Sequence, residues 1–329
     1  MRIADMKTVF SGIQPTGIVH LGNLLGAINN WAKISKEESK NYFCIVDLHS
    51  LTSLPKRNEL NSSIVSTSKA LFSSGIDLNN SIIYLQSDLP QHSYLSWILS
   101  SYCQIGELQR MTQFKEKSSS HGTHAGLFTY PILMAADILI HKANEVPVGE
   151  DQTQHLELTR NIAERFNNYF GDVFPIPEKT GNSIAKRVMS LRHPDKKMSK
   201  SADDLNGTVY ISDSKDEIMK KFKSSVTDSE NEIRYDTESK QGISNLLEIY
   251  SSINNISIDD SEKEFSNSQY GEFKIAVGES VVNFLNPIQE NFNEYSDEKV
   301  LDTLKENAIK ANESADKTIS VVKEAIGLN

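Results

Sequence analysis

The sequence predicts an α/β fold, in which a doubly wound parallel sheet is followed by a helical C-terminal region. Short apolar runs alternate with helical patterns over the first half of the chain, and this alternation is typical of the βαβ crossovers that build such a sheet. Beyond about residue 193, helical patterns replace the strands. The length of 329 residues, with 38% hydrophobic and 24% charged residues, is ordinary for a globular protein with an ample core.

The first predicted strand runs into a turn within residues 8–23, TVFSGIQPTGIVHLGN. Glycine and proline break the strand, and apolar residues recur at helical spacing from Gly22 onward. The strand therefore leads to a helix N-terminus, where unpaired N–H groups attract phosphate and a glycine lets a flat base approach. His20 and Asn23 add hydrogen-bond donors. The pattern predicts an ATP site, and the alternative is a loop that leads into a core helix.

The second predicted strand is the continuous apolar run at residues 42–46, as expected for a central parallel strand covered on both faces. Asp47 and His49 follow at its carboxyl end, the edge at which open α/β sheets bind ligands. His49 is therefore a candidate site residue. The alternative is a histidine that is hydrogen-bonded in a strand-to-helix loop.

Further elements follow in order. The pattern predicts a helix near residues 60–72, a strand at 82–85, a helix near 95–102 and a helix at 107–117. Serine, glycine and histidine content predicts a mobile loop at 118–126.

The stretch YPILMAADIL has Pro131 where a helix is expected to begin. Tyr130, Met134 and Asp137 then fall at positions i, i+4 and i+7, on one helix face. An acidic residue on an apolar face needs a partner, and the plain alternative is a buried Asp satisfied by backbone donors or a cation. Residues 146–148 follow as a strand, and 149–152 open a helix at the same sheet edge as His20 and His49.

Composition excludes several classes of protein. No segment reaches the roughly 18 to 20 apolar residues of a membrane span, and the first ten residues lack an apolar signal-peptide core. The two cysteines, Cys44 and Cys103, form no close metal-type pair, which favours a reducing cytoplasm. The net charge of -10 argues against indiscriminate nucleic-acid binding but permits a specific RNA partner. Two local clusters of basic residues could serve RNA or simply be solvated helix faces: Arg110, Lys115 and Lys117, and Lys220, Lys221 and Lys223.

A second motif, KMSKS, occupies residues 197–201. Together with HLGN at 20–23 it resembles the HIGH and KMSKS signatures of class I aminoacyl-tRNA synthetases, with Asn23 in place of the second histidine. In order and spacing, further segments make nearly the whole chain similar to the bacterial tryptophanyl-tRNA synthetases: FCIVDLH, LQRMTQFKEK, YPILMAADIL, VPVGEDQTQHLELTRNIAERFN, VMSL, SSVTDSENEIRYD and GISNLLEIY. One departure is His141, where an aromatic residue such as tyrosine is expected.

The resemblance implies that L-tryptophan reacts with ATP, assisted by Mg²⁺, to give tryptophanyl-adenylate and pyrophosphate, and then passes to tRNA(Trp). It implies a homodimer without membrane attachment. It also implies a Rossmann-like catalytic domain at 1–192, a helical tRNA (anticodon)-binding domain at 193–297, and a final helix at 298–329 that packs back on the catalytic domain.

The same resemblance assigns the site residues, with no resident metal ligands. The catalytic set, near the reacting phosphates, is Gln14, Lys117, Lys197 and Lys200. The ATP set is His20, Gly22, Asn23, Gly149, Asp151, Met198 and Ser199. The tryptophan set is Phe10, His49, Tyr130, Met134, Asp137, Val146, Val148 and Gln152. The alternative for the lysines is an exposed flexible loop, and the alternative for the valines and methionine is plain core.

Three rival functions share part of this pattern. A tyrosyl-tRNA synthetase has the same fold and signatures, but Asp137 is an acceptor suited to an indole N–H. A nucleotidyltransferase with an HxGH motif would explain residues 8–23 and leave the helical half unexplained. An inactive synthetase-like binding protein would have no need of Gln14, Lys197 and Lys200.

Overall fold

The structure, a computed structural model, describes residues 7–112, 114, 124–180, 188–199 and 205–328. At its centre lies a five-stranded sheet in the order β3-β2-β1-β4-β5, with every pair parallel. The strands are β1 (Thr8–Ile13), β2 (Lys40–Ile45), β3 (Ser81–Leu85), β4 (Glu145–Pro147) and β5 (Glu178–Thr180). The predicted doubly wound parallel sheet is therefore confirmed.

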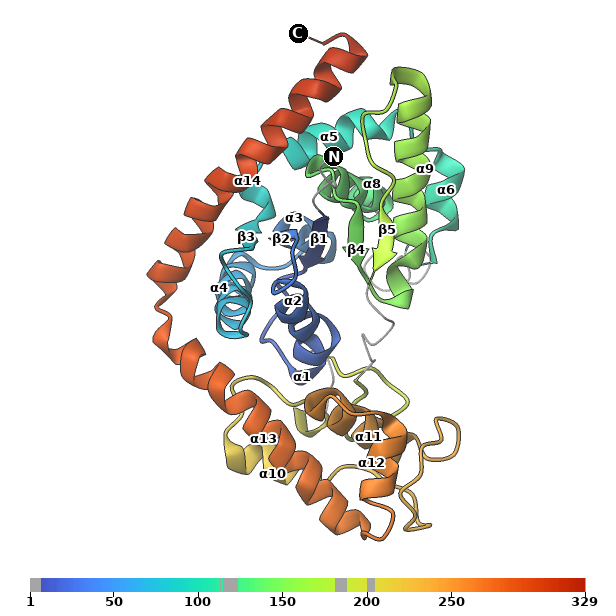
Figure 1. Cartoon of the computed structure of the whole chain (residues 1–329), viewed down its shortest axis with the longest axis vertical. Helices are drawn as coiled ribbons and strands as arrows, with labels where there is room; N and C mark the ends of the chain where they lie inside the picture. The colour runs from blue at the N-terminus through green and yellow to red at the C-terminus, as the bar shows by residue number, and fades with distance from the viewer. Residues whose placement is uncertain (1–6, 113, 115–123, 181–187, 200–204, 329) are drawn as a thin grey trace.

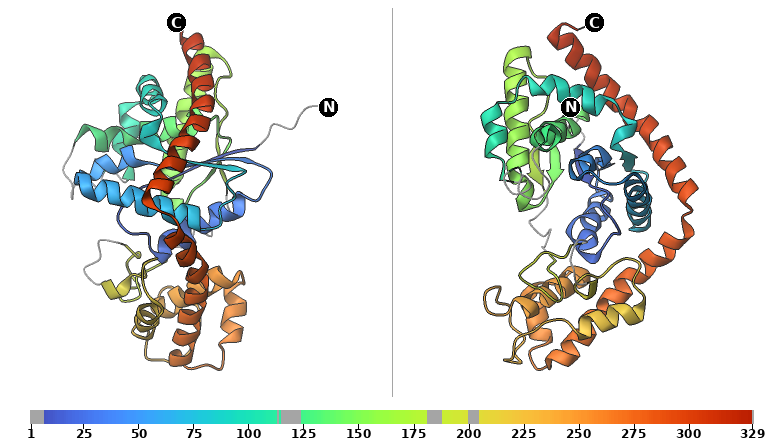
Figure 2. Two further views of the ribbon diagram at one scale, coloured as in Figure 1. Left: turned by 90° about the vertical axis from the view of Figure 1, so that its left-hand side faces the viewer. Right: turned by 180° about the vertical axis from the view of Figure 1, so that it is seen from behind.

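Helices cover both faces of the sheet (Figures 1 and 2). In the first part of the chain they are α1 (Leu21–Asn23), a π-helical segment η1 (Leu24–Ile28), α2 (Asn29–Ile34), α3 (Asp47–Ser50), η2 (Leu51–Ser53), α4 (Arg57–Ser73), η3 (Gln86–Asp88), α5 (Gln91–Ser100), α6 (Ile105–Arg110), α8 (Ala125–Ile140), η4 (Glu150–Gln152) and α9 (Thr153–Phe170).

Neighbouring residues of β2 show why this strand is central. The Phe43 ring stacks on Trp31 of α2, with centroids 4.6 Å apart. Tyr42, the residue before Phe43, points to the opposite face and stacks on His141 at the end of α8, with ring centroids 3.9 Å apart. Because successive side chains of a strand alternate between faces, a strand buried on both sides must be apolar throughout.

The second part of the chain is helical. It contains η5 (Leu205–Gly207), α10 (Lys215–Lys223), α11 (Gln241–Asn254), α12 (Ile258–Glu264), α13 (Tyr270–Glu294) and α14 (Asp297–Ile326). Helices α10 to α13 form the lower lobe in Figure 1, and α14 rises from it along the sheet. Asn307 Nδ2 of α14 donates to the backbone oxygen of Ile83 at 2.9 Å, so this helix closes the β3 edge.

Three predicted boundaries were wrong. Pro131 does not begin a helix, because α8 starts at Ala125 and places Pro131 inside it. The ring Nδ1 of His124 accepts from the backbone N–H of Leu127 at 3.2 Å and so caps the true start. The predicted helix at 107–117 begins earlier, at Ile105, and α6 ends at Arg110. The predicted loop ends before Ala125, and its residues 118–123 lie outside the described part.

Among the described residues, no helix combines the length and the apolar character that crossing a membrane requires.

Candidate functional site

The candidate site lies at the carboxyl edge of the sheet. Since all five strands are parallel, the segments that follow β1, β2, β3 and β4 meet at this edge, where open α/β sheets bind ligands. These segments carry Gln14, His49, Gln86 and Val148. Gln14 is exposed, and Val148 is half-buried.

The HLGN turn forms the N-terminus of α1. The backbone N–H of His20 donates to Asn23 Oδ1 at 3.2 Å, so the asparagine that replaces the second histidine of the signature helps to hold the turn. On its other side the turn is held by the chain after the KMSKS motif, because Leu21 N–H donates to Val209 O at 2.8 Å. The turn is followed directly by η1, a π-helical segment of the kind often found at functional sites.

Gly22 is required by contacts within the chain. A Cβ at this position would lie 3.0 Å from two atoms of the His20 ring and 3.6 Å from Val188 Cβ. Any side chain here would therefore displace the histidine ring. The prediction that this position serves the approach of a base stays a prediction, and the structure adds a packing reason for the glycine.

The described part of the KMSKS motif packs beside this turn. Met198 N–H donates to Val188 O at 2.9 Å, and Thr208 Oγ1 donates to Ser199 O at 3.0 Å. Met198 is buried, whereas Lys197 is exposed. Val188 thus lies close to Gly22 and binds Met198, which brings the two signatures together across about 175 residues of sequence. Lys117 and Lys200 lie outside the described residues.

The acidic residue of YPILMAADIL lies at the centre of a buried polar cluster. Asp137 is 1% exposed. Its Oδ2 accepts from His49 Nε2 at 2.8 Å, and its Oδ1 accepts from Gln86 Nε2 at 2.7 Å. His92 Nδ1 lies 2.7 Å from the same Oδ1. Asp137 is thus satisfied by side chains from α3, η3 and α5, and not by the backbone donors or cation of the plain alternative.

The charge of Asp137 is fixed by these neighbours. Burial alone would raise the pKa of Asp137, but the hydrogen bonds offered by His49 and His92 outweigh it and lower the pKa of Asp137 below its ordinary value. The carboxylate is therefore an ionised acceptor at neutral pH.

The residues predicted to surround tryptophan differ in accessibility. Phe10 and Val146 are buried in the core, on neighbouring strands. The Tyr130 ring meets the His49 ring edge-on at 6.0 Å, and its hydroxyl is 2.8 Å from His155 Nε2. Half-buried positions belong to Tyr130, Met134, Val148, Gly149 and Gln152. Asp151 is exposed, and its Oδ2 accepts from Gln152 Nε2 at 3.1 Å.

Sequence reasoning missed a group of buried residues behind Asp137. Tyr84 of β3 lies with its hydroxyl 3.1 Å from His92 Nε2 and 2.8 Å from His141 Nε2. These residues, with Gln86, come from separate elements, so no spacing in the sequence relates them. The only available signal was the unexpected histidine at 141.

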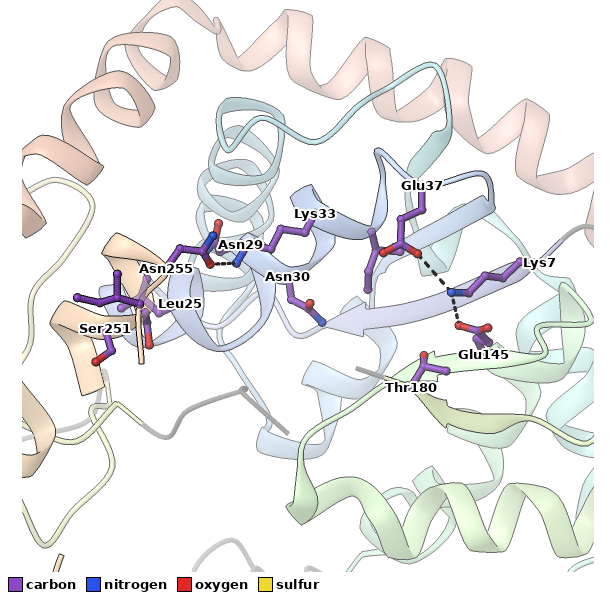
Figure 3. Close-up of a pocket in the computed structure, with 13 residues that line it drawn as sticks. Lys7, Leu25, Asn29, Asn30, Lys33, Glu37, Glu145, Thr180, Ser251 and Asn255 are labelled. Carbon is purple, nitrogen blue, oxygen red and sulfur yellow. Dashed lines mark hydrogen bonds and ion pairs between the residues drawn. The ribbon is translucent and has the colours of Figure 1, made fainter. Parts of the chain in front are cut away.

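A cavity of about 400 Å³ lies elsewhere, between α2 and α11 (Figure 3). In its lining, Lys33 Nζ donates a hydrogen bond to Asn255 Oδ1 at 2.8 Å. Lys7 Nζ forms an ion pair with Glu145 Oε2 at 2.8 Å. Lys7 and Glu145 lie at the amino ends of β1 and β4. The cavity is therefore at the opposite sheet edge from the predicted site. Among the described residues, no group of three or more His, Cys, Asp or Glu side chains could hold a metal ion.

Comparison with known proteins gives one consistent result. Residues 4–286 match the family model described as tRNA synthetases class I (W and Y). The tryptophan–tRNA ligase of Oceanobacillus iheyensis is 47% identical over 325 residues, which cover 98% of this chain and 99% of that protein. Among solved structures, tryptophanyl-tRNA synthetase from Mycoplasma pneumoniae has a TM-score of 0.89 at 35% identity and 98% coverage of both chains.

The corresponding enzyme from Campylobacter jejuni, complexed with ADP and tryptophan, has a TM-score of 0.80 at 32% identity, covering 98% of this chain and 100% of that one. A tyrosyl-tRNA synthetase from Aeropyrum pernix, with a TM-score of 0.72 at 16% identity over 92% of this chain and 90% of that one, shares the fold alone. The predicted resemblance is confirmed, and the chain belongs to the class I tRNA synthetases for tryptophan and tyrosine, among the bacterial tryptophanyl-tRNA synthetases.

Proposed function

We propose that this chain activates L-tryptophan with ATP and transfers it to tRNA(Trp). The observation that carries the proposal is the joining of the HLGN turn and the KMSKS segment through Val188, beside a sheet edge that also holds an ionised Asp137. The residues proposed for the nucleotide and the proposed acceptor for an indole N–H thus share one edge of the sheet. The names of relatives at 44 to 47% identity give the same amino acid.

In the first step, a carboxylate oxygen of tryptophan bonds to the α-phosphorus of ATP, and the bond from that phosphorus to the bridging oxygen breaks. Pyrophosphate leaves with the electron pair. The attacking carboxylate is ionised at neutral pH, so no general base is needed, and catalysis rests on positioning and on stabilisation of charge. In the second step, a terminal ribose hydroxyl of the tRNA attacks the carbonyl carbon, loses its proton and displaces AMP.

We assign the ATP contacts to the HLGN turn and to the segment at 149–152. His20 and Asn23 lie at the N-terminus of α1, where a phosphate is favoured. The full set proposed for ATP is His20, Gly22, Asn23, Gly149, Asp151, Met198 and Ser199. Met198 is buried, so its contribution would be to seat the loop, while the exposed Lys197 would reach the nucleotide.

Charge on the departing pyrophosphate would be met by Lys117, Lys197 and Lys200, with Gln14 near the reacting phosphorus. Mg²⁺ would arrive with ATP and neutralise phosphate charge. Mg²⁺ is commonly bound through substrate phosphates and water rather than by a cage made only of protein ligands.

Tryptophan would bind between α8 and the carboxyl ends of β1 and β4. Asp137 Oδ2 has one donor among the described residues, His49, and a carboxylate oxygen can accept a second. The indole N–H would be that donor. Tyr130, Met134, Val148 and Gln152, all half-buried, would line the pocket, with Phe10, His49 and Val146 behind them.

The helical region at 193–297 is proposed to bind the tRNA. Its predicted basic cluster on α10 is partly internal, because Lys221 Nζ pairs with Asp213 at 2.6 Å and is buried. Lys220 and Lys223 are exposed and remain available to phosphates. We propose the cytoplasm as the place of action, since the substrate is tRNA.

A homodimer is also proposed. Exposed aromatic side chains at Tyr94 and Trp97 lie three residues apart on α5, and the exposed Ile105 begins α6 nearby. Trp97 is 78% exposed, which is unusual for so large an apolar side chain. Burial of this surface against a second copy would remove it from water.

The test is ATP–pyrophosphate exchange, measured with each of the standard amino acids in turn. We expect exchange with tryptophan and almost none with phenylalanine or tyrosine. A site that binds a polar group rejects analogues without it by roughly 10⁴ to 10⁵, because its own buried group is then left unpaired. Asp137→Ala should lose much of the preference for tryptophan over phenylalanine and keep its affinity for ATP. Exchange driven by tyrosine would overturn the assignment in favour of the tyrosine enzyme.

A further inference from the structure

Asp137 is supported by more than its direct partners. Behind it, His92, Tyr84 and His141 form a continuous polar chain that runs from the pocket into the core between β3, α5 and α8. All three are at most 4% exposed. Burying several polar groups in an otherwise apolar core costs free energy unless their hydrogen bonds are made. These three hydrogen-bonded side chains are therefore candidates for a functional role.

The proton positions along this chain follow from its first member. An ionised carboxylate only accepts hydrogen bonds, so the His92 nitrogen 2.7 Å from Asp137 Oδ1 must carry a proton. In a neutral imidazole the other nitrogen, Nε2, is then a bare acceptor. Tyr84 therefore donates its single hydroxyl proton to His92. The Tyr84 oxygen in turn accepts from His141 Nε2.

The surroundings of His141, the residue furthest from Asp137, agree with hydrogen bonds that are all donated toward Asp137. With its proton on Nε2, His141 has a bare Nδ1, and this buried atom has no hydrogen-bond partner among the described residues. An unpaired N–H donor at Nδ1 would cost more free energy than an unpaired bare nitrogen, since an imidazole N–H is a strong, directional donor. If His92 were charged, it would donate to Tyr84, and Tyr84 would donate to His141 Nε2. The His141 proton would then lie on Nδ1 and be unpaired.

Neither His141 nor Tyr84 exchanges protons readily near neutral pH. Burial lowers the pKa of His141 well below its ordinary value, so the ring stays neutral, and it is stacked on Tyr42. Burial raises the pKa of Tyr84, so the phenol stays protonated. The other titratable groups around Asp137 and this chain are His49, Cys44, Tyr42, Asp47 and, further out, Lys40. Burial also raises the pKa of the Cys44 thiol.

We propose that His92, held in one tautomer by Tyr84 and His141, is the positioning residue that keeps the Asp137 carboxylate turned toward the indole N–H. The selection of tryptophan then depends on residues that never touch it. His141, the residue that departs from the expected pattern, supplies the final donor of this chain. This inference rests on the proposed function and adds to it the origin of its specificity.

The experiment compares two substrates in pyrophosphate exchange: tryptophan, and its analogue in which sulfur replaces the indole N–H. The ratio of their kcat/KM values isolates the N–H contact. It is measured between pH 6 and pH 8.5 in the wild-type protein and in His92→Leu, which removes both nitrogens. We expect the wild-type ratio to be large and flat with pH. In His92→Leu the ratio should fall roughly 10- to 100-fold, the usual worth of a hydrogen bond to a charged group. It should stay flat with pH, because a loss of this size leaves the Asp137 carboxylate ionised throughout this pH range.

Two further variants separate positioning from packing. His92→Asn keeps an N–H donor near the place of Nδ1 and should restore most of the ratio. Leu99→Ala, on the same helix and fully buried, loses packing but removes no polar group. It should affect both substrates equally at every pH.

A smaller change guards against a variant that fails to fold. Tyr84→Phe removes one oxygen and keeps the ring, and should lower the ratio about 2- to 10-fold, the usual worth of a neutral hydrogen bond. If His92→Leu and Tyr84→Phe reduce kcat/KM for both substrates in parallel and leave their ratio unchanged, as Leu99→Ala should, the positioning role is wrong. If the wild-type protein shows no exchange with tryptophan at all, the proposed function itself fails.

Discussion

Replacing Asp137 by alanine should destabilise the fold as well as alter specificity, and the structure allows the size to be worked out. The change strands the buried donors of His49 and Gln86, and it removes the carboxylate that lies 2.7 Å from the buried His92 Nδ1. Each unpaired buried donor costs about 1 to 3 kcal/mol, and part of this is offset because the carboxylate no longer needs to be desolvated. Breaking one partner out of a buried charged cluster typically costs about 3 to 5 kcal/mol, and we expect that loss here at pH 7.

The pH dependence of this loss has a definite sign. The folded-state pKa of Asp137 is lowered relative to the unfolded value of about 4, so its contribution is fully present above that value and is lost as the pH falls through the folded pKa. The difference in unfolding free energy between the wild-type protein and Asp137→Ala should thus be constant from pH 7 to pH 5. It should narrow below about pH 4.

Urea denaturation at several pH values measures this difference. The fluorescence of Trp31, which is buried against Phe43, should report the unfolding. Asp302→Ala is the control, because Asp302 is exposed and its pair with Lys305 should contribute less than about 1 kcal/mol. A loss below about 1 kcal/mol for Asp137→Ala at pH 7, or a difference that does not narrow in acid, would refute the reasoning.

Three more predictions follow from the site and the helical region. Lys197→Ala should slow adenylate formation in single-turnover experiments far more than it weakens tryptophan binding, because pyrophosphate gains charge only as the bond breaks; weaker tryptophan binding at an unchanged rate would reject that role. Lys240→Met should lower the free energy of unfolding by about 1 to 3 kcal/mol in urea, since the buried ammonium pairs with Asp228 and Glu230, the second of them exposed; no change would show that the pairs contribute nothing. Sedimentation at micromolar concentration should show a dimer of the 36.9 kDa chain, and a single species at the monomer mass would count against the proposed α5 interface.

The sequence was most informative where one element decides its own structure. The apolar run of β2 was predicted as a central strand because both faces of that strand are covered, and the structure confirms it. The spacing of Tyr130, Met134 and Asp137 was predicted as one helix face, and all three lie on α8. In both cases the pattern and the burial concern neighbours along the chain.

Long-range contacts account for what the sequence could not provide. Strand β5 (Glu178–Thr180) is short and polar, and it exists because it pairs with β4. Pro131 looked like the start of a helix because proline favours the first turn, but the His124 cap seven residues earlier starts α8. The donors to Asp137 come from three elements brought together only by folding.

The large sequence separation between β3 and α14 affects the timing of folding during synthesis. The edge of β3 is covered by Asn307, which is 224 residues away in sequence from Ile83. At a synthesis rate of roughly 5 to 20 residues per second, this interval lasts about 11 to 45 s. An uncovered strand edge invites pairing with other chains throughout that time. During this interval, chaperone contact with the exposed edge of β3 would be most useful to the nascent protein. The interval ends only when α14 docks on that edge.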